Sequence, residues 1–257
     1  SGPDYFTIIC VSNTNTQKAS PNSLGGTTDL HYEYANTNKV AGMPFMPDGC
    51  NIVDRVETLT PADTLCVLTT CHNAFTPGGQ EGYLVISALH PVGGEPWNFN
   101  HLVGSEMVVN ASGVVYSINA IPFNAVAANG PLKKTDVDGD MVLDFDDVEY
   151  ESAPEFLIID SFVAIAGSQL ALINLTGSDR DKNKIRFVAY NDNEFLLSDT
   201  REFACWFDQP LTTVSAIFQE NFLKGTPHDP AELDISCSGN GRLETGWAMI
   251  DSISVKT

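Results

Sequence analysis

The segment Leu30-His-Tyr-Glu-Tyr-Ala-Asn36 alternates large apolar residues with polar ones. Successive side chains of a β-strand point to opposite faces, so this period of two predicts a half-buried strand. Short apolar or alternating runs recur along the chain, and Gly, Pro, Asn and Asp separate them. They predict strands at residues 5–11, 29–34, 82–89, 106–109, 114–118, 156–159, 169–175, 184–189 and 248–255.

Helical periodicity is scarce by comparison. Short helices are predicted near residues 60–65 and 144–149, and the stretch 213–222 fits either a strand or a helix. Many short strands with frequent turn signals are typical of β-sandwiches. We therefore expect an all-β fold of two tandem antiparallel β-sandwich modules, either immunoglobulin-like or jelly-roll-like.

A weak internal repeat relates the two halves of the chain. The segment 30–36 resembles Ile185-Arg-Phe-Val-Ala-Tyr-Asn191 in its apolar and aromatic positions, and a cysteine follows each terminal Asn after 14 residues (Cys50 and Cys205). Each segment also follows a short strand that ends near an Asn. Chance similarity between β segments is the alternative to an internal duplication. Duplication predicts modules at residues 1–130 and 151–257, joined by a linker at 131–150.

Length and charge narrow the class of protein. The 257 residues suit one large β domain or two modules, and 33 acidic residues against 13 Lys and Arg give a net charge of -20. Such a surface repels nucleic acid and anionic lipid, and it attracts divalent cations and basic partners. We therefore expect no nucleic-acid binding. No run of 18 apolar residues is present, so we also expect no membrane insertion.

The cysteines indicate an oxidising compartment. There are six, and none forms the Cys-x-x-Cys pair that structural zinc sites commonly use, so disulfides are favoured over zinc or buried thiols. We therefore predict a secreted or cell-surface protein. If the two halves fold separately, Cys205 and Cys237 pair with each other, because they are the only cysteines of the second half. The four cysteines of the first half then allow three pairings.

The strongest motif is the acidic loop Asp136-Val-Asp-Gly-Asp-Met-Val-Leu-Asp-Phe-Asp-Asp147. It places aspartates at positions 1, 3, 5, 9 and 12, which is the spacing of an EF-hand-type calcium loop. Calcium takes oxygen ligands, position 7 supplies a backbone carbonyl, and position 9 often acts through water. The predicted calcium ligands are Asp136, Asp138, Asp140, Val142, Asp144 and Asp147.

These twelve residues resemble the calcium-binding repeats of dockerins and thrombospondin type 3 modules, in which the aspartate ladder lacks the first flanking helix. The resemblance implies a structural calcium ion. The loop departs from the pattern at position 6, where Met141 replaces Gly, and at position 12, where Asp replaces Glu. An acidic turn without an ion is the alternative. Three further acids close by are candidates for a second, weaker site: Asp146, Glu149 and Glu151.

No catalytic signature stands out. The serine-hydrolase elbow, the zinc-protease signature, the P-loop and the Rossmann fingerprint are absent, and the five histidines are scattered. A glycosidase needs only two carboxylates, which cannot be picked out of 33 acids. We therefore predict that the protein is not an enzyme, and a secreted hydrolase is the least favoured alternative.

The leading hypothesis is a calcium-stabilised extracellular structural protein, such as a subunit of a filament or surface layer. It would self-assemble or bind other cell-surface proteins, and strands at both chain ends would suit β-addition between subunits. The alternative is a carbohydrate-binding or adhesive module that binds a glycan. Trp97, in a Gly-Gly-Glu-Pro-Trp turn, is the expected exposed aromatic, whereas Trp206 and Trp247 are expected in the core.

Overall fold

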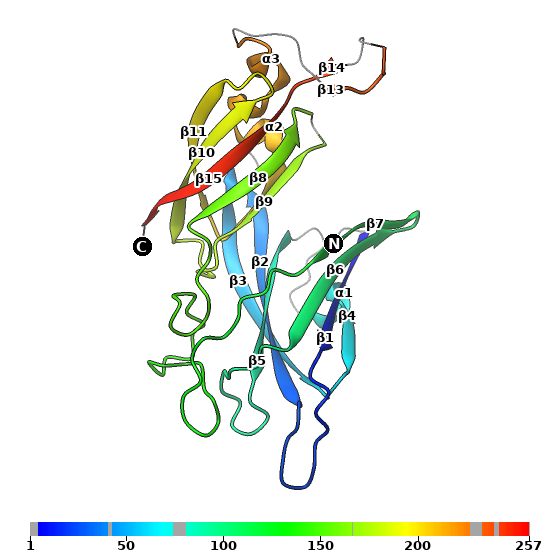
Figure 1. The fold of residues 1–257 in the computed structure, drawn as a ribbon, viewed down its shortest axis with the longest axis vertical. Coiled ribbons are helices and arrows are strands. Elements are labelled where there is room, and N and C mark those ends of the chain that lie inside the picture. The colour runs from blue at the N-terminus through cyan, green and yellow to red at the C-terminus, as the bar shows by residue number, and fades with distance from the viewer. Residues whose placement is uncertain are drawn as a thin grey trace. The chain divides into compact units, whose positions relative to one another are not determined.

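The computed structural model of the chain describes residues 5–40, 43–73, 81–165, 167–226, 233–238 and 242–256. Most of these residues form antiparallel strands, and the helices are single turns of three or four residues (Figure 1). The predicted all-β class is therefore confirmed. Every helix in the described part of the chain is far too short to cross a membrane.

The chain folds as two compact units, which are described separately. Unit 1 comprises residues 1–36 and 51–153, and unit 2 comprises residues 37–50 and 154–257. The long hairpin formed by residues 28–40 and 43–59 is therefore divided between the units. Residues 28–36 and 51–59 belong to unit 1, and residues 37–40 and 43–50 belong to unit 2. The segment 131–150, expected as a linker, is part of unit 1.

Unit 1 is built from two antiparallel sheets. The first has the order β4-β1-β6-β7, and the second has the order β3-β2-β5, of which the far end of β2 and β3 belongs to unit 2. A single helical turn, α1 (Thr69–His72), follows β4. The strands are β1 (Tyr5–Asn13), β2 (Thr28–Val40), β3 (Met43–Leu59), β4 (Thr64–Leu68), β5 (Glu81–Leu89), β6 (Leu102–Asn110) and β7 (Gly113–Asn119).

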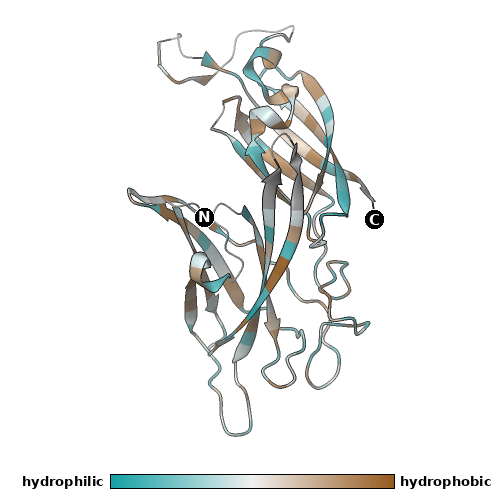
Figure 2. Ribbon diagram, turned by 180° about the vertical axis from the view of Figure 1, so that it is seen from behind, coloured by the Kyte–Doolittle hydropathy of each residue, from teal (hydrophilic) through white to brown (hydrophobic). Residues whose placement is uncertain are grey.

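One core joins the two sheets of unit 1. Leu30, Tyr32 and Tyr34 from β2 are buried there with Val11 from β1 and Leu59 from β3. The alternation that predicted the strand thus places these residues inward. This face-to-face arrangement is sandwich-like, and hydrophobic residues recur along the strands of both units (Figure 2).

Unit 2 has a four-stranded sheet of order β11-β10-β15-β8 and a two-stranded sheet of β12 and β9. Its core includes Phe162, Phe187 and Phe218, whose rings meet edge to face at centroid distances of 5.2 and 5.4 Å. The elements are β8 (Phe156–Val163), β9 (Gln169–Ile173), β10 (Lys182–Asn191), β11 (Leu196–Ala204), β12 (Trp206–Pro210), α2 (Leu211–Val214), η1 (Ala216–Phe218), α3 (Glu220–Leu223), β13 (Leu233–Asp234), β14 (Arg242–Leu243) and β15 (Thr245–Lys256).

The strand predictions are confirmed, and two helix predictions are wrong. Each predicted strand coincides with a described one, while β3, β4, β11, β12, β13 and β14 were not predicted. The stretch 213–222 lies within the helical turns α2, η1 and α3. Residues 60–65 form a turn that leads into β4, and residues 144–149 form bends. In both cases Asp side chains accept nearby backbone N–H groups, which favours turns over helix.

The two units share part of their strand order. In unit 1, β1 pairs with β4, and the hairpin β2–β3 is extended by β5; in unit 2, β9 pairs with β12, and the hairpin β10–β11 is extended by β15. Asn13 and Asn174 also play the same part, because each backbone N–H donates to the carbonyl just before the paired strand (Asp63 at 2.9 Å, Cys205 at 2.8 Å). This correspondence supports internal duplication.

The strands at the chain ends are not edge strands. β1 lies between β4 and β6, and β15 lies between β10 and β8. β4 pairs with Ile8–Ser12 of β1, and β8 pairs with Thr245–Asp251 of β15, so the expectation of edge strands is wrong along these residues. β-Addition between subunits stays a prediction. Alternation along a segment reports a buried face and carries no information about how many neighbours the strand has.

The disulfides also differ from expectation. Cys10 pairs with Cys66 across β1 and β4, and Cys50 pairs with Cys205. The predicted Cys205–Cys237 pair is wrong, because the far end of the β2–β3 hairpin brings Cys50 into unit 2. Cys71 and Cys237 are exposed thiols.

Candidate metal centre

The acidic loop starts from a segment that unit 1 holds in place. The Thr135 N–H donates to the Pro96 carbonyl at 3.1 Å, and the Asn98 N–H donates to the Lys133 carbonyl at 2.8 Å. The Asn98 side chain donates to the carbonyls of Ala125 and Ala127, both at 3.0 Å. The entry to the loop is therefore attached to the chain that precedes β6.

The exit from the loop returns to the same place. The Val126 N–H donates to the Glu149 carbonyl at 2.8 Å, and the Thr135 hydroxyl lies 3.3 Å from the Tyr150 hydroxyl. Tyr150 is buried, and its ring lies 5.9 Å from that of Phe145. Hydrogen bonds therefore join the entry and the exit of the loop to neighbouring segments of unit 1.

Inside the loop, the carboxylates organise the backbone. Asp136 accepts the N–H groups of Gly139 at 2.6 Å and Met141 at 3.2 Å, and Asp140 accepts the N–H of Val142 at 2.8 Å. Met141, at position 6, has a φ of 65°, which is the left-handed conformation that favours glycine. The turn that Gly makes in EF-hand loops is therefore made here by Met141 itself.

Three carboxylates converge at one side of the loop. One oxygen from each of Asp136, Asp138 and Glu149 lies within 4.8 Å of the other two, so these residues could hold a metal ion. Glu149 is only 3% exposed, and one of its oxygens accepts the Val137 N–H. A buried carboxylate beside two others is unfavourable unless a cation or further donors balance its charge.

Asp144, the fourth carboxylate among the predicted ligands, has a raised pKa. Partial burial raises the pKa of Asp144, and the charges of Asp140, Asp138, Asp146 and Asp136 raise it further. A raised carboxyl pKa means that protonation, or a bound cation, is favoured there. Asp144 thus interacts electrostatically with Asp140 and with two of the converging carboxylates, Asp136 and Asp138.

The carboxylate at position 12 points elsewhere. Asp147 accepts the backbone N–H of Ser152 at 2.9 Å and its hydroxyl at 2.8 Å, and these hydrogen bonds lower the Asp147 pKa. Val142 has an exposed side chain, and its carbonyl remains a predicted ligand. The sequence pattern placed Glu149 only in a second, weaker site. One feature of the sequence could have identified it: Glu149 is the first Glu after the aspartates of the loop, and EF-hand loops end on a bidentate Glu.

The tryptophans are placed differently from expectation. The Trp97 indole N–H donates to the Thr28 hydroxyl at 3.1 Å, and its ring stacks on Phe99 at 5.1 Å, so it packs against its neighbours. Trp247, expected in the core, is 42% exposed and stacks on Tyr190 at 4.8 Å. It is the exposed aromatic of the two because its strand position faces away from the core of unit 2.

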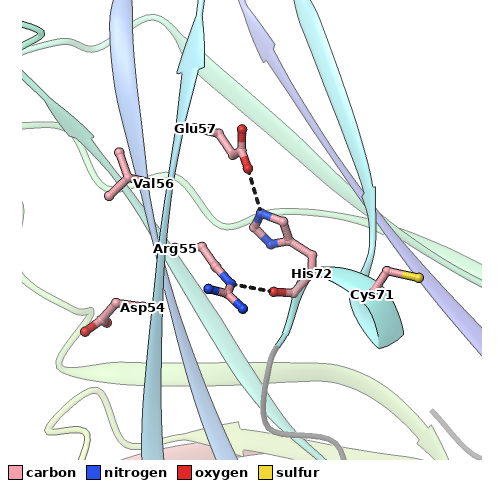
Figure 3. Close-up of a pocket in the computed structure, with 6 residues that line it drawn as sticks. All are labelled: Asp54, Arg55, Val56, Glu57, Cys71 and His72. Atoms are coloured by element: carbon pink, nitrogen blue, oxygen red, sulfur yellow. Dashed lines mark hydrogen bonds and ion pairs between the residues drawn. The ribbon is translucent and has the colours of Figure 1, made fainter.

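A pocket beside β3 gathers titratable side chains (Figure 3). The His72 ring lies between the Tyr34 hydroxyl, 2.8 Å from Nδ1, and the Glu57 carboxylate, 3.4 Å from Nε2. Figure 3 shows Arg55 and Glu57 directed at His72, whereas the Cys71 thiol points away from it. His72 therefore links α1 to β2 and β3.

No protein-family model matches the chain, and comparison with curated proteins and with solved structures gives no significant match.

Proposed function

We propose that this chain is a secreted or cell-surface structural protein in which calcium, bound in the acidic loop, stabilises unit 1. The observation that carries the proposal is the convergence of Asp136 and Asp138 on the buried Glu149. These three residues, together with Asp140, Asp144 and the Val142 carbonyl, offer an all-oxygen donor set. Such a set suits calcium, which takes six to eight oxygens in flexible geometry.

The setting favours calcium over magnesium and an extracellular location over the cytosol. Calcium outside cells saturates even weak sites, with dissociation constants of about 10⁻⁴–10⁻³ M. The two disulfides, Cys10–Cys66 and Cys50–Cys205, persist in oxidising compartments. A structural ion is favoured over a switch, because sensor EF-hands act by opening two helices, whereas backbone hydrogen bonds close both ends of this loop.

Self-assembly is supported by the edge strand β7. It is the last strand of its sheet in the described part of the chain, and Val115, Tyr116 and Ile118 are about half exposed on it. No charged residue lies between Glu106 and Lys133. Edge strands are usually protected by charges, prolines or a covering element.

Charge makes β7 the preferred contact between copies. Each copy carries a net charge of -20, so two copies repel each other over most of their surface. Along the uncharged β7 this repulsion is weakest, and two β7 strands can pair antiparallel about a two-fold axis. The edge strand β11, by contrast, carries Asp199, Arg201 and Glu202, which oppose such pairing.

Analytical ultracentrifugation and electron microscopy in calcium test this proposal. Wild-type protein should form concentration-dependent assemblies, and Ile118→Lys on β7 should disperse them without changing the melting temperature. The matched control is Leu196→Lys, which places the same charge on an equally exposed position of the β11 edge. Dispersed single particles of the wild type, or equal behaviour of the two variants, would remove the assembly proposal.

A carbohydrate-binding function is the second candidate, and Trp247 is what favours it. Its exposed ring, stacked on Tyr190, lies on the sheet face opposite the core of unit 2. Exposed aromatic rings provide apolar faces on which sugars can stack. A glycan array on wild-type protein and Trp247→Ala decides this point, since loss of all hits in the variant supports binding and the absence of hits in the wild type removes it.

A further inference from the structure

A second group of potential metal ligands lies on unit 1, outside the acidic loop. His31 and Glu33 project from β2 on the face opposite its buried residues, and Asp54 projects from β3. The His31 Nε2 lies 3.5 Å from an Asp54 oxygen, and Nδ1 lies 3.9 Å from a Glu33 oxygen. One ligand atom of each residue lies within 4.8 Å of the other two.

The separation of His31 Nε2 from the Asp54 oxygen fits two ligands around an ion better than a direct hydrogen bond. It exceeds the usual N–H···O range of about 2.7–3.2 Å. Two ligands bonded to a tetrahedral zinc ion at about 2.0–2.2 Å lie roughly 3.4 Å apart. The 3.5 Å separation of Nε2 from the Asp54 oxygen corresponds to that edge.

The charges of the group also favour a cation. With a neutral imidazole, the three side chains carry two negative charges within a few ångströms. A divalent ion would neutralise both and leave His31 as a neutral donor.

We propose that His31, Glu33 and Asp54 form a binding site for a divalent transition metal ion such as Zn²⁺, separate from the calcium loop. The imidazole nitrogen sets the class of metal, because calcium and magnesium prefer oxygen, whereas zinc accepts nitrogen and carboxylate ligands together. Three protein ligands leave one tetrahedral position for water. The site is open, since the side chains of His31, Glu33 and Asp54 are 26%, 31% and 60% exposed.

The competing explanation is an ion-pair triad, in which a protonated His31 bridges the two carboxylates. That arrangement needs no metal. The two explanations differ in one observable, namely stoichiometric binding of a metal ion.

The test is calorimetric titration of ZnCl₂ into the full chain at slightly alkaline pH, with saturating calcium present to occupy the acidic loop. Cys71→Ser and Cys237→Ser are included throughout, because exposed thiols would bind zinc themselves. One zinc ion per chain is expected. His31→Gln and Asp54→Asn should each weaken it by more than about 10-fold, since loss of even an outer-shell partner weakens metal sites by roughly 10–100-fold.

The control is His101→Gln, which removes an exposed histidine outside the group and should leave zinc binding unchanged. Co²⁺ provides a second readout, since its visible absorption reports nitrogen and oxygen coordination and should disappear in His31→Gln. If His31→Gln fails to fold, the exposed Asp54→Asn still decides the question. Absence of zinc binding in the parent protein, or binding that survives both substitutions, overturns the proposal.

Discussion

At the scale of single residues, Met141 is the position where the acidic loop conflicts with local preference. Its φ of 65° costs a side-chain-bearing residue free energy that glycine does not lose, and its side chain is 56% exposed. Met141→Gly should therefore stabilise the calcium-bound protein by about 1 kcal/mol and tighten calcium binding several-fold. Val142→Gly is the control, since Val142 does not have a positive φ.

Calcium titration and thermal unfolding of both variants measure this effect. Met141→Gly should have a higher calcium affinity and a higher melting temperature than the wild type. Val142→Gly should equal the wild type in both quantities or fall below it. A loss of calcium affinity in Met141→Gly would mean that the loop does not turn at position 6 in solution.

Tyr32 supplies a prediction about alkaline pH. Its side chain is fully buried, and its hydroxyl has no hydrogen-bond partner among the described residues. Burial, with a smaller effect of Glu57, raises its pKa to about 12. A raised folded-state pKa of a tyrosine favours the protonated form, so this contribution to stability is complete below the unfolded pKa near 10 and is lost as pH rises towards 12.

Tyr32→Phe should therefore equal or exceed the wild type in stability at neutral pH, by up to about 1 kcal/mol, because it removes an unsatisfied buried hydroxyl. It should also lose less stability than the wild type between pH 10 and pH 12. Urea unfolding at a series of pH values measures both effects. Marked destabilisation at neutral pH would show that the hydroxyl has a partner in solution.

At the scale of elements, the sequence predicted strands well where one face is buried and poorly elsewhere. The alternation of residues 29–34 and 184–189 reported real inward faces in β2 and β10. β3 was missed because it contains Pro44 and Pro47, and β11 was missed because charged residues interrupt it. Pairing partners depend on the whole sheet, so the central positions of β1 and β15 could not be predicted locally.

The disulfide of unit 2 is an element-scale prediction. Cys50–Cys205 closes a loop with a sequence separation of 155, and a loop of this order should contribute up to about 5 kcal/mol by restricting the unfolded chain. Cys50→Ser with Cys205→Ser should therefore lower the melting temperature strongly, whereas Cys237→Ser should not change it. Non-reducing peptide mapping checks the pairing directly, and a Cys205–Cys237 peptide would contradict it.

The acidic loop makes its own prediction about pH. Protons compete with calcium for Asp144, whose pKa is raised, so calcium affinity should fall as pH is lowered towards that pKa. Without calcium the sign reverses for this group: a raised folded-state pKa means that Asp144 adds stability as pH falls and opposes folding when ionised. Calcium calorimetry at decreasing pH measures the first effect, and a pH-independent affinity would place Asp144 outside the site.

Of the three converging carboxylates, the sequence placed only Asp136 and Asp138 in the same predicted site. The spacing of Asp136 and Asp138 is a local property, and the structure brings these two residues together. The third member, Glu149, depends on the burial of Thr135 and Tyr150 against unit 1, which no local pattern reports. Asp147 was assigned by spacing, but its carboxylate is held by Ser152.

At the scale of the whole molecule, the net charge of -20 should govern the proposed association between copies. Repulsion between copies is screened over about 10 Å at 0.1 M salt and over shorter distances at higher salt. If copies pair along the uncharged β7, association should strengthen as sodium chloride is raised. Sedimentation velocity at increasing salt measures this effect, and association that weakens with salt would indicate contacts between opposite charges instead.

The most direct test of the central claim, that calcium in the acidic loop stabilises unit 1, is the melting temperature with millimolar calcium and with chelator. For a dissociation constant of about 10⁻⁴ M, calcium should add roughly 1–2 kcal/mol and raise the melting temperature by a few degrees. Glu149→Gln should abolish this shift, and Asp147→Asn should retain it. A wild-type melting temperature that is the same in calcium and in chelator would contradict the claim.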